Sequence, residues 1–171
     1  MKIIKLFSFI LLLCVYNISG AEQVMNIVEF FSFGCSHRYQ SENTVKQAIN
    51  ATQAKYVPVV VIQSPEQIAV SSIYTACMLK GIGWQFRDAY FKAVFVEGYP
   101  DYSPTTVKHV LEAIGANVTE ILSIAQSKVV QDKMSFDIQL IQKYKVSSTP
   151  TFVINGTTVL EGDSALNGML R

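Results

Sequence analysis

Residues Val28–Glu42 read VEFFSFGCSHRYQSE, an apolar stretch followed by a glycine, a single cysteine and a polar run. The apolar part belongs to VMNIVEFFSF (Val24–Phe33), which is rich in β-branched and aromatic residues and predicts a buried strand. After Cys35 the composition tolerates a helix, and Lys55–Gln63 predicts a second strand, with Pro58 favouring its start or an edge position. Strand, helix and strand together predict a βαβ unit with a parallel sheet.

Between Ser64 and about Val146 the apolar residues have helical spacing, and glycines and prolines divide the segment. The expected helices are Pro65–Lys80, Gly83–Val96, Ser103–Ile114, Val118–Lys128 and Gln131–Tyr144. Strand character returns at Thr151–Ile154 and Thr157–Leu160, which flank Asn155-Gly156, the dipeptide most favoured in a two-residue hairpin turn. Because two strands alone are barely stable, we expect the hairpin to join the first sheet and the helices to pack on one side.

Residues 1–21 have the order of a secretory signal peptide: a basic start, an apolar stretch over Leu6–Ile18 and small residues up to Ala21. The apolar stretch is short for a membrane-spanning helix, so we expect cleavage after Ala21 and a periplasmic or secreted protein. An uncleaved anchor is one alternative, and a lipoprotein modified at Cys14 is another.

Length and composition limit the function. The chain has 171 residues and a formal net charge of +1, which fits one domain and, without a basic run, argues against nucleic acid as the main partner. No further apolar run is long enough to span a membrane after signal cleavage. Cleavage leaves Cys35 and Cys77, too few cysteines for a disulfide scaffold and without metal-ligand spacing, so we expect no metal and no cofactor. The helical spacing around Cys77 predicts a buried core thiol, with a Cys35–Cys77 disulfide as the alternative.

The order of elements, together with EFFSFGCSH and SSTPTFVING, resembles the thioredoxin-fold family of periplasmic disulfide oxidoreductases typified by DsbA. The resemblance runs over roughly Val24–Leu160. It implies an α/β thioredoxin fold with an inserted helical domain between the βαβ unit and the C-terminal hairpin. The implied organisation is a signal peptide at 1–21, a thioredoxin-like domain formed by 22–63 and 147–171, and the inserted helical domain at 64–146.

In this resemblance Cys35 falls on the family's nucleophilic cysteine, with Ser36 and His37 as the two intervening residues. Arg38 falls on the resolving cysteine, so the chain reads C-S-H-R where the family reads C-x-x-C. A helix N-terminus stabilises a thiolate, His37 offers a hydrogen bond or positive charge, and Arg38 adds a permanent cation. We therefore expect an ionised Cys35 at neutral pH. The alternatives are an inert packed cysteine, an ordinary surface histidine and a solvated arginine.

Two further positions follow from the resemblance. Glu29 falls on the family's buried acid, which helps to move protons near the cysteine pair, and both this role and structural retention stay open here. Thr149-Pro150 falls on the cis-proline loop, whose backbone edge lies beside the sulfur and pairs with an extended substrate segment. Ser36, Thr149 and Pro150 are therefore the expected substrate-binding residues, and Cys35, His37, Arg38 and Glu29 the expected catalytic ones.

The residues leave three classes of function open. The first is a monothiol oxidoreductase of the cell envelope, which attacks disulfides of exported proteins and is released by a substrate thiol, by a reductant such as glutathione or by a redox partner protein. The second is a catalytically inactive binding, chaperone or assembly module that keeps the peptide groove. The third is a thiol sensor, since an exposed thiolate oxidises readily. We favour the first, an isomerase- or reductase-like enzyme.

Overall fold

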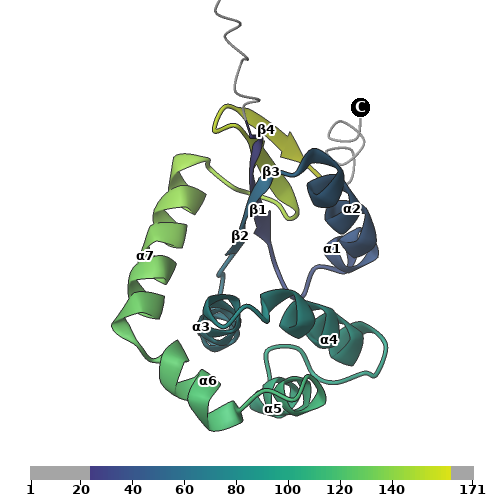
Figure 1. Ribbon diagram of the computed structural model, residues 1–171, viewed down its shortest axis with the longest axis vertical. Coiled ribbons are helices and arrows are strands. Elements are labelled where there is room, and N and C mark those ends of the chain that lie inside the picture. The colour runs from purple at the N-terminus through teal and green to yellow at the C-terminus, as the bar shows by residue number, and fades with distance from the viewer. Residues whose placement is uncertain (1–23, 163–171) are drawn as a thin grey trace, which may run out of the picture.

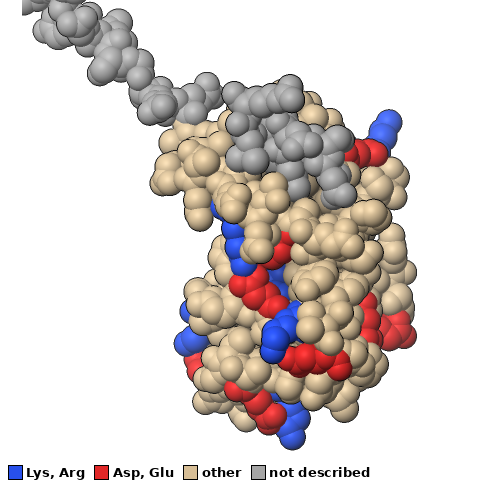
Figure 2. Space-filling model, turned by 90° about the vertical axis from the view of Figure 1, so that its right-hand side faces the viewer, with Lys and Arg blue, Asp and Glu red and all other residues tan. Residues whose placement is uncertain are grey.

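The computed structural model describes residues 24–162. The signal peptide expected at 1–21 and the chain beyond residue 162 lie outside the described residues. Within the described part, no helix is both long and apolar enough to cross a bilayer. Acidic and basic side chains lie side by side on the face that Figure 2 shows, so neither sign forms a continuous surface there.

Four strands form one mixed sheet in the order β2-β1-β3-β4 (Figure 1). The strands are β1 (Asn26–Phe31), β2 (Lys55–Val60), β3 (Thr151–Ile154) and β4 (Thr158–Glu161). The β1–β2 pair is parallel, whereas β3 runs antiparallel to both β1 and β4. The predicted βαβ unit and its junction with the hairpin are confirmed. Pro58 lies in β2 at the edge of the sheet, where its missing N–H leaves no ladder bond unmade.

The hairpin loop is one residue longer than predicted. Ile154 pairs with Thr158, so residues 155–157 form the loop instead of a two-residue turn. Asn155 has a φ of +50°, and its side-chain Oδ1 accepts a hydrogen bond of 2.9 Å from the backbone N–H of Asn26. This bond to β1 accounts for asparagine at the turn, because asparagine tolerates the left-handed region and accepts from neighbouring backbone.

Helices cover both faces of the sheet. The expected single helix after Cys35 is divided at Ser41 into α1 (Ser36–Gln40) and α2 (Glu42–Thr52). The apolar side of α2 packs on one face of the sheet, and α7 (Lys128–Lys143) lies along the opposite face in Figure 1. Burial on both faces explains why β1 is apolar except at the exposed Asn26 and at Glu29.

Five helices lie between β2 and β3, as the α/β thioredoxin fold with an inserted helical domain predicts. They are α3 (Pro65–Leu79), α4 (Gly83–Phe95), α5 (Pro104–Ala113), α6 (Val118–Ala125) and α7. The boundary between α6 and α7 differs most from the expected ranges. Ser127 caps α7 there, and its side-chain oxygen accepts from the backbone N–H of Val130. Apart from α7, these helices pack below the sheet in the view of Figure 1.

An aromatic cluster joins the end of β1 to the inserted helices. The ring of Phe33 lies 4.7 Å from that of Tyr90 and 5.4 Å from that of Tyr74, measured between centroids. It also contacts Phe86 and Phe91 at 5.9 and 5.8 Å. Such pairs stabilise a core beyond the area they bury. The segment that leads into Cys35 is therefore anchored in the largest core of the molecule.

Candidate active site

Cys35 is the N-cap residue of α1 and has an extended backbone, with φ −86° and ψ 107°. Its carbonyl accepts the first helical bond, from Tyr39, and its side chain is half-buried. The Sγ atom donates a hydrogen bond of 3.3 Å to the carbonyl oxygen of Thr149. Both described cysteines are free, so the alternative of a Cys35–Cys77 disulfide is wrong, and Cys77 is a buried core thiol as predicted.

The Thr149–Pro150 peptide bond is cis, as expected. Pro150 is buried, and its carbonyl accepts a hydrogen bond of 2.8 Å from the N–H of Gly162 at the end of the hairpin. The cis-proline loop thus brings the backbone carbonyl of Thr149 to the sulfur of Cys35, although the two residues are 114 positions apart in the sequence. Ser36 and His37, the other two expected site residues near Cys35, are exposed.

Cys35 opens into a shallow depression of about 410 Å³. The residues lining it are Ser32, Gly34, Cys35, Gln63, Gln67, Asp101, Tyr102 and Thr149. They come from the segment after β1, the β2–α3 connection, the first turn of α3, the α4–α5 loop and the cis-proline loop. The sequence did not predict that the α4–α5 loop contributes to the site, because its glycine, proline and tyrosines indicate only a break between helices.

Tyr102 fastens the α4–α5 loop to the segment before Cys35. Its hydroxyl lies 2.8 Å from the Oγ of Ser32 and accepts a hydrogen bond of 2.9 Å from the N–H of Gly34. The backbone of Tyr102 has a φ of +54°, and its N–H donates to the hydroxyl of Tyr90 over 2.8 Å. Because a bulky residue rarely adopts a positive φ, these contacts hold the loop in an otherwise unfavourable conformation.

Arg38 points away from solvent, which corrects the interpretation of a polar, exposed setting. The whole residue is 0% exposed. Its Nε donates to Oε1 of Glu29, its Nη2 donates to Oε2 of Glu29 over 3.3 Å, and its Nη1 lies 2.6 Å from Oε2 of Glu42. Since two carboxylates already compensate this charge, the contacts do not support the expected direct role of Arg38 at the sulfur.

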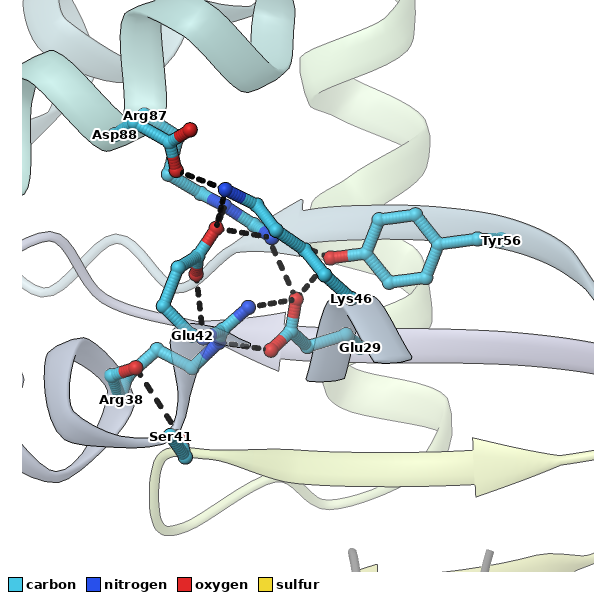
Figure 3. A network of polar contacts seen from close by, with 8 residues as sticks. All are labelled: Glu29, Arg38, Ser41, Glu42, Lys46, Tyr56, Arg87 and Asp88. Carbon is cyan, nitrogen blue, oxygen red and sulfur yellow. Dashed lines mark hydrogen bonds and ion pairs between the residues drawn. The ribbon is translucent and has the colours of Figure 1, made fainter. Parts of the chain in front are cut away.

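A second buried arginine completes the cluster, which we call the buried charge network (Figure 3). Nη1 of Arg87, from α4, donates to Oε2 of Glu29 over 3.0 Å and to the hydroxyl of Tyr56 over 2.7 Å. Its Nη2 lies 3.1 Å from Oε1 of Glu42. The members nearer the surface are Lys46 and Asp88. The network joins β1, β2, α1, α2 and α4, so it connects the sheet to the helical insertion.

Comparisons with known proteins agree with this architecture. The family model of the DSBA-like thioredoxin domain matches residues 69–169. The chain belongs to this family. It is similar to a protein named thiol:disulfide interchange protein DsbA from Burkholderia cepacia, with 25% identity over 81% of this chain and 66% of that one. A protein of the same name from Pseudomonas syringae pv. tomato is 22% identical over 77% of this chain and 63% of its own length. The chain thus spans a little under two thirds of these relatives.

Solved structures of DsbA proteins share the fold. A variant of DsbA from Pseudomonas aeruginosa superposes with a TM-score of 0.74 and 21% identity, over 83% of this chain and 78% of that one. DsbA from Xylella fastidiosa gives a TM-score of 0.73 and 19% identity, over 86% and 84%. These likenesses establish the thioredoxin fold of this DsbA-like chain, with its helical insertion.

The electrostatics of the network keep Glu29 ionised in this DsbA-like protein. Burial alone would raise the pKa of Glu29, but the charges of Arg38 and Arg87 outweigh burial and lower it. For Glu42 burial is the larger effect and raises the pKa. Burial also raises the pKa of Tyr56 well above its usual value, so Tyr56 stays protonated and donates to Glu29. Glu29 therefore has the partners that an acid in an apolar strand requires.

Replacing Tyr102 by phenylalanine should cost about 1–2 kcal/mol of stability, because the N–H of Gly34 and the hydroxyl of Ser32 lose their shared partner. Urea unfolding measures this cost, and the rate of Cys35 alkylation reports any displacement of the segment. Tyr99→Phe is the matched control, since the Tyr99 ring stacks on His109 and its hydroxyl makes no hydrogen bond within residues 24–162. Equal stability of the two variants would contradict the anchoring role of Tyr102.

Proposed function

We propose that this DsbA-like protein is a monothiol thiol:disulfide exchange enzyme of the cell envelope, with Cys35 as its nucleophile. The main support for this proposal is the position of the Cys35 sulfur. It lies at a helix N-terminus in an open depression, against the carbonyl that precedes cis-Pro150. Backbone N–H groups at a helix start favour a thiolate, which is the form that attacks disulfides.

The reaction proceeds by two exchanges. The Cys35 thiolate attacks one sulfur of a substrate disulfide, the substrate S–S bond breaks, and the other substrate sulfur leaves as a thiolate that takes a proton. The product is a mixed disulfide on Cys35. A second thiol, from the substrate or from glutathione, then attacks the mixed disulfide and releases Cys35. Release by a substrate thiol isomerises the substrate. Release by glutathione leaves the substrate sulfur in a mixed disulfide with glutathione, and a second glutathione attacks this bond to give the reduced substrate and oxidised glutathione.

We place Arg38 at the position of a resolving cysteine, three residues after the nucleophile. The burial of Arg38 and its ion pairs with Glu29 and Glu42 support a structural role there. With arginine in place of a second thiol in α1, and with Cys77 free and buried, Cys35 has no disulfide partner within residues 24–162, so an outside thiol completes the cycle. Glu29 then serves mainly to balance the two arginines, and proton transfer near the sulfur falls to exposed His37 or to solvent.

The proposed substrates are extended, cysteine-containing segments of exported proteins. We propose that such a segment joins as an added strand at the Thr149–Pro150 backbone, with the exposed Ser36 beside Cys35 as a further contact. The signal-peptide pattern of residues 1–21 and the curated DsbA relatives support export to an oxidising compartment. Glutathione or a redox partner protein would supply the releasing thiol.

A binding module without turnover is the second candidate, and one observation favours it. An apolar groove of about 350 Å³ lies between α3, α5 and α6. Its lining includes Ile73, Val107, Leu111 and Leu122, and Tyr102 borders both this groove and the Cys35 depression. A client with an apolar segment could bind there without any exchange at the sulfur.

Turnover distinguishes the two candidates. We expect the protein to catalyse the glutathione-dependent reduction of insulin disulfides, with the activity lost in Cys35→Ser. The buried thiol supplies the matched control, because Cys77→Ser removes a cysteine that is inaccessible to substrate and should keep the activity. Equal rates for the unmodified protein and Cys35→Ser would contradict the enzymatic proposal. Suppressed aggregation of a client by Cys35→Ser would then support the binding module.

A further inference from the structure

The α4–α5 loop places one carboxylate at the Cys35 depression. Oδ1 of Asp101 accepts hydrogen bonds from the hydroxyl of Tyr90 over 3.1 Å and from the N–H of Tyr102 over 2.9 Å. Oδ2 lies over the backbone of Gly34, so close that a Cβ atom added to Gly34 would come within 2.5 Å of it. The residue before Cys35 is thus a glycine where the carboxylate of Asp101 approaches the main chain.

Asp101 is the one residue with a charged side chain among the described residues that line the depression. Gln63, in the β2–α3 connection, and Gln67, in the first turn of α3, are neutral. Arg38, the nearest arginine in sequence, points into the protein, and the carboxylates of Glu29 and Glu42 compensate its positive charge. A substrate that approaches the sulfur therefore meets a negative charge, with exposed His37 as the nearby basic group on α1.

One oxygen of this carboxylate is available to a ligand. Within residues 24–162, Oδ1 takes both hydrogen bonds of Asp101, and Oδ2 accepts none. Burial raises the pKa of Asp101, while the hydrogen bonds from Tyr90 and Tyr102 oppose the effect. A lysine or arginine beside a substrate cysteine would supply the missing donor in a charge-assisted bond.

We propose that Asp101 makes Cys35 selective for disulfides that carry a positive charge next to the attacked sulfur, and that it disfavours acidic ones. The inference rests on the proposed function, because it names the substrate class of the same site. In exported proteins the preferred segments would have lysine or arginine beside the cysteine.

Small disulfides that differ mainly in charge test the proposal. Cystamine is cationic, hydroxyethyl disulfide is neutral and 3,3′-dithiodipropionate is anionic, and each transfers half of itself to Cys35 while its other half leaves as a thiolate. Rates of mixed-disulfide formation are measured at pH 8 in the Cys77→Ser background. We expect Asp101→Asn to lower the cystamine-to-dithiodipropionate rate ratio by about three- to tenfold, as one charge at close range requires. Added salt should lower the same ratio in the protein that keeps Asp101.

Two controls separate charge from structure. Asn at position 101 keeps an oxygen that can accept from Tyr90 and Tyr102, so the loop should stay in place. Asp132→Asn removes a carboxylate from an exposed pair with Lys128 on α7 and should leave the ratio unchanged. Alkylation gives a readout that needs no disulfide: Asp101→Asn should raise the rate with anionic iodoacetate relative to neutral iodoacetamide.

The outcomes are distinct. Rapid reaction with all three disulfides, with ratios that Asp101→Asn and salt leave unchanged, would overturn the inference and leave the proposed function intact. Normal alkylation of Cys35 without reaction with any disulfide would overturn the proposed function and this substrate assignment together.

Discussion

Replacing Glu29 by glutamine is expected to destabilise the protein by about 3–5 kcal/mol, because two buried guanidinium groups would lose the carboxylate they share. The side chains of Glu29, Arg38 and Arg87 are each 0% exposed, so water cannot replace the lost partner. Glu42 alone would face both arginines as a negative charge, and the amide that replaces Glu29 leaves a single oxygen to accept from Arg38, Arg87 and Tyr56. Urea unfolding followed by circular dichroism measures the effect.

A surface pair provides the matched control. Glu120 pairs with Lys80 across α6 and α3, and both side chains are 44% exposed. Glu120→Gln should therefore cost less than about 1 kcal/mol. The double variant Glu29→Gln, Arg38→Met should be more stable than the two single losses predict, because it removes both members of a buried pair. Similar costs for Glu29→Gln and Glu120→Gln would contradict the buried charge network.

The same substitution should change how stability depends on pH. The pKa of Glu29 is lowered by folding, so its contribution is fully present above the unfolded value near 4.5 and is lost as pH falls through the folded value. The pKa of Glu42 is raised by burial, so its contribution has the opposite sign. Glu29→Gln should therefore lose less stability than the unmodified protein on acidification below pH 4.5. Parallel acid-unfolding curves would contradict this role of Glu29.

Cys35 should react with iodoacetamide at least about a thousand times faster than Cys77 in the folded protein at pH 8, since Cys77 is both inaccessible and hard to ionise. Burial raises the pKa of Cys77 to about 12, and this residue is 0% exposed. Cys35 is half-buried and opens into the depression. Peptide mapping by mass spectrometry after timed alkylation measures both rates in one sample.

Urea supplies the control for this comparison. In the unfolded chain both thiols have the same environment, so their alkylation rates should become similar. Comparable rates for Cys35 and Cys77 without urea would mean that the helical core opens readily or that Cys35 is inert. Either result would contradict the assignment of Cys35 as the reactive thiol.

The sequence predicts the part of the site that is local. The apolar run before Cys35, the turn into α1 and the proline after Thr149 are each read from neighbouring residues, and the structure confirms their arrangement. The direction of Arg38 could not be read in this way. Its partners are Glu29, across the β1–α1 turn, and Glu42, in the helix that begins only after the break at Ser41. A polar run therefore looked exposed although its largest side chain is buried.

Long-range contacts explain what the sequence missed. Arg87 reaches Glu29 from 58 residues away, and Tyr102 reaches Gly34 from 68 residues away. Nothing in the spacing around Arg87 or Asp101 distinguishes them from surface residues, because their roles depend on how the helical insertion packs against the sheet. The fold class could be inferred from element order, whereas these partners require the packed structure.

The proposed chemistry requires that Cys35 alone forms a mixed disulfide with a substrate. The most direct measurement incubates the Cys77→Ser variant with hydroxyethyl disulfide, then maps the adduct by mass spectrometry before and after glutathione is added. We expect one half of the probe on Cys35, and we expect excess glutathione to remove it completely and return the free thiol. An unmodified Cys35 in a folded protein that iodoacetamide still alkylates would contradict it.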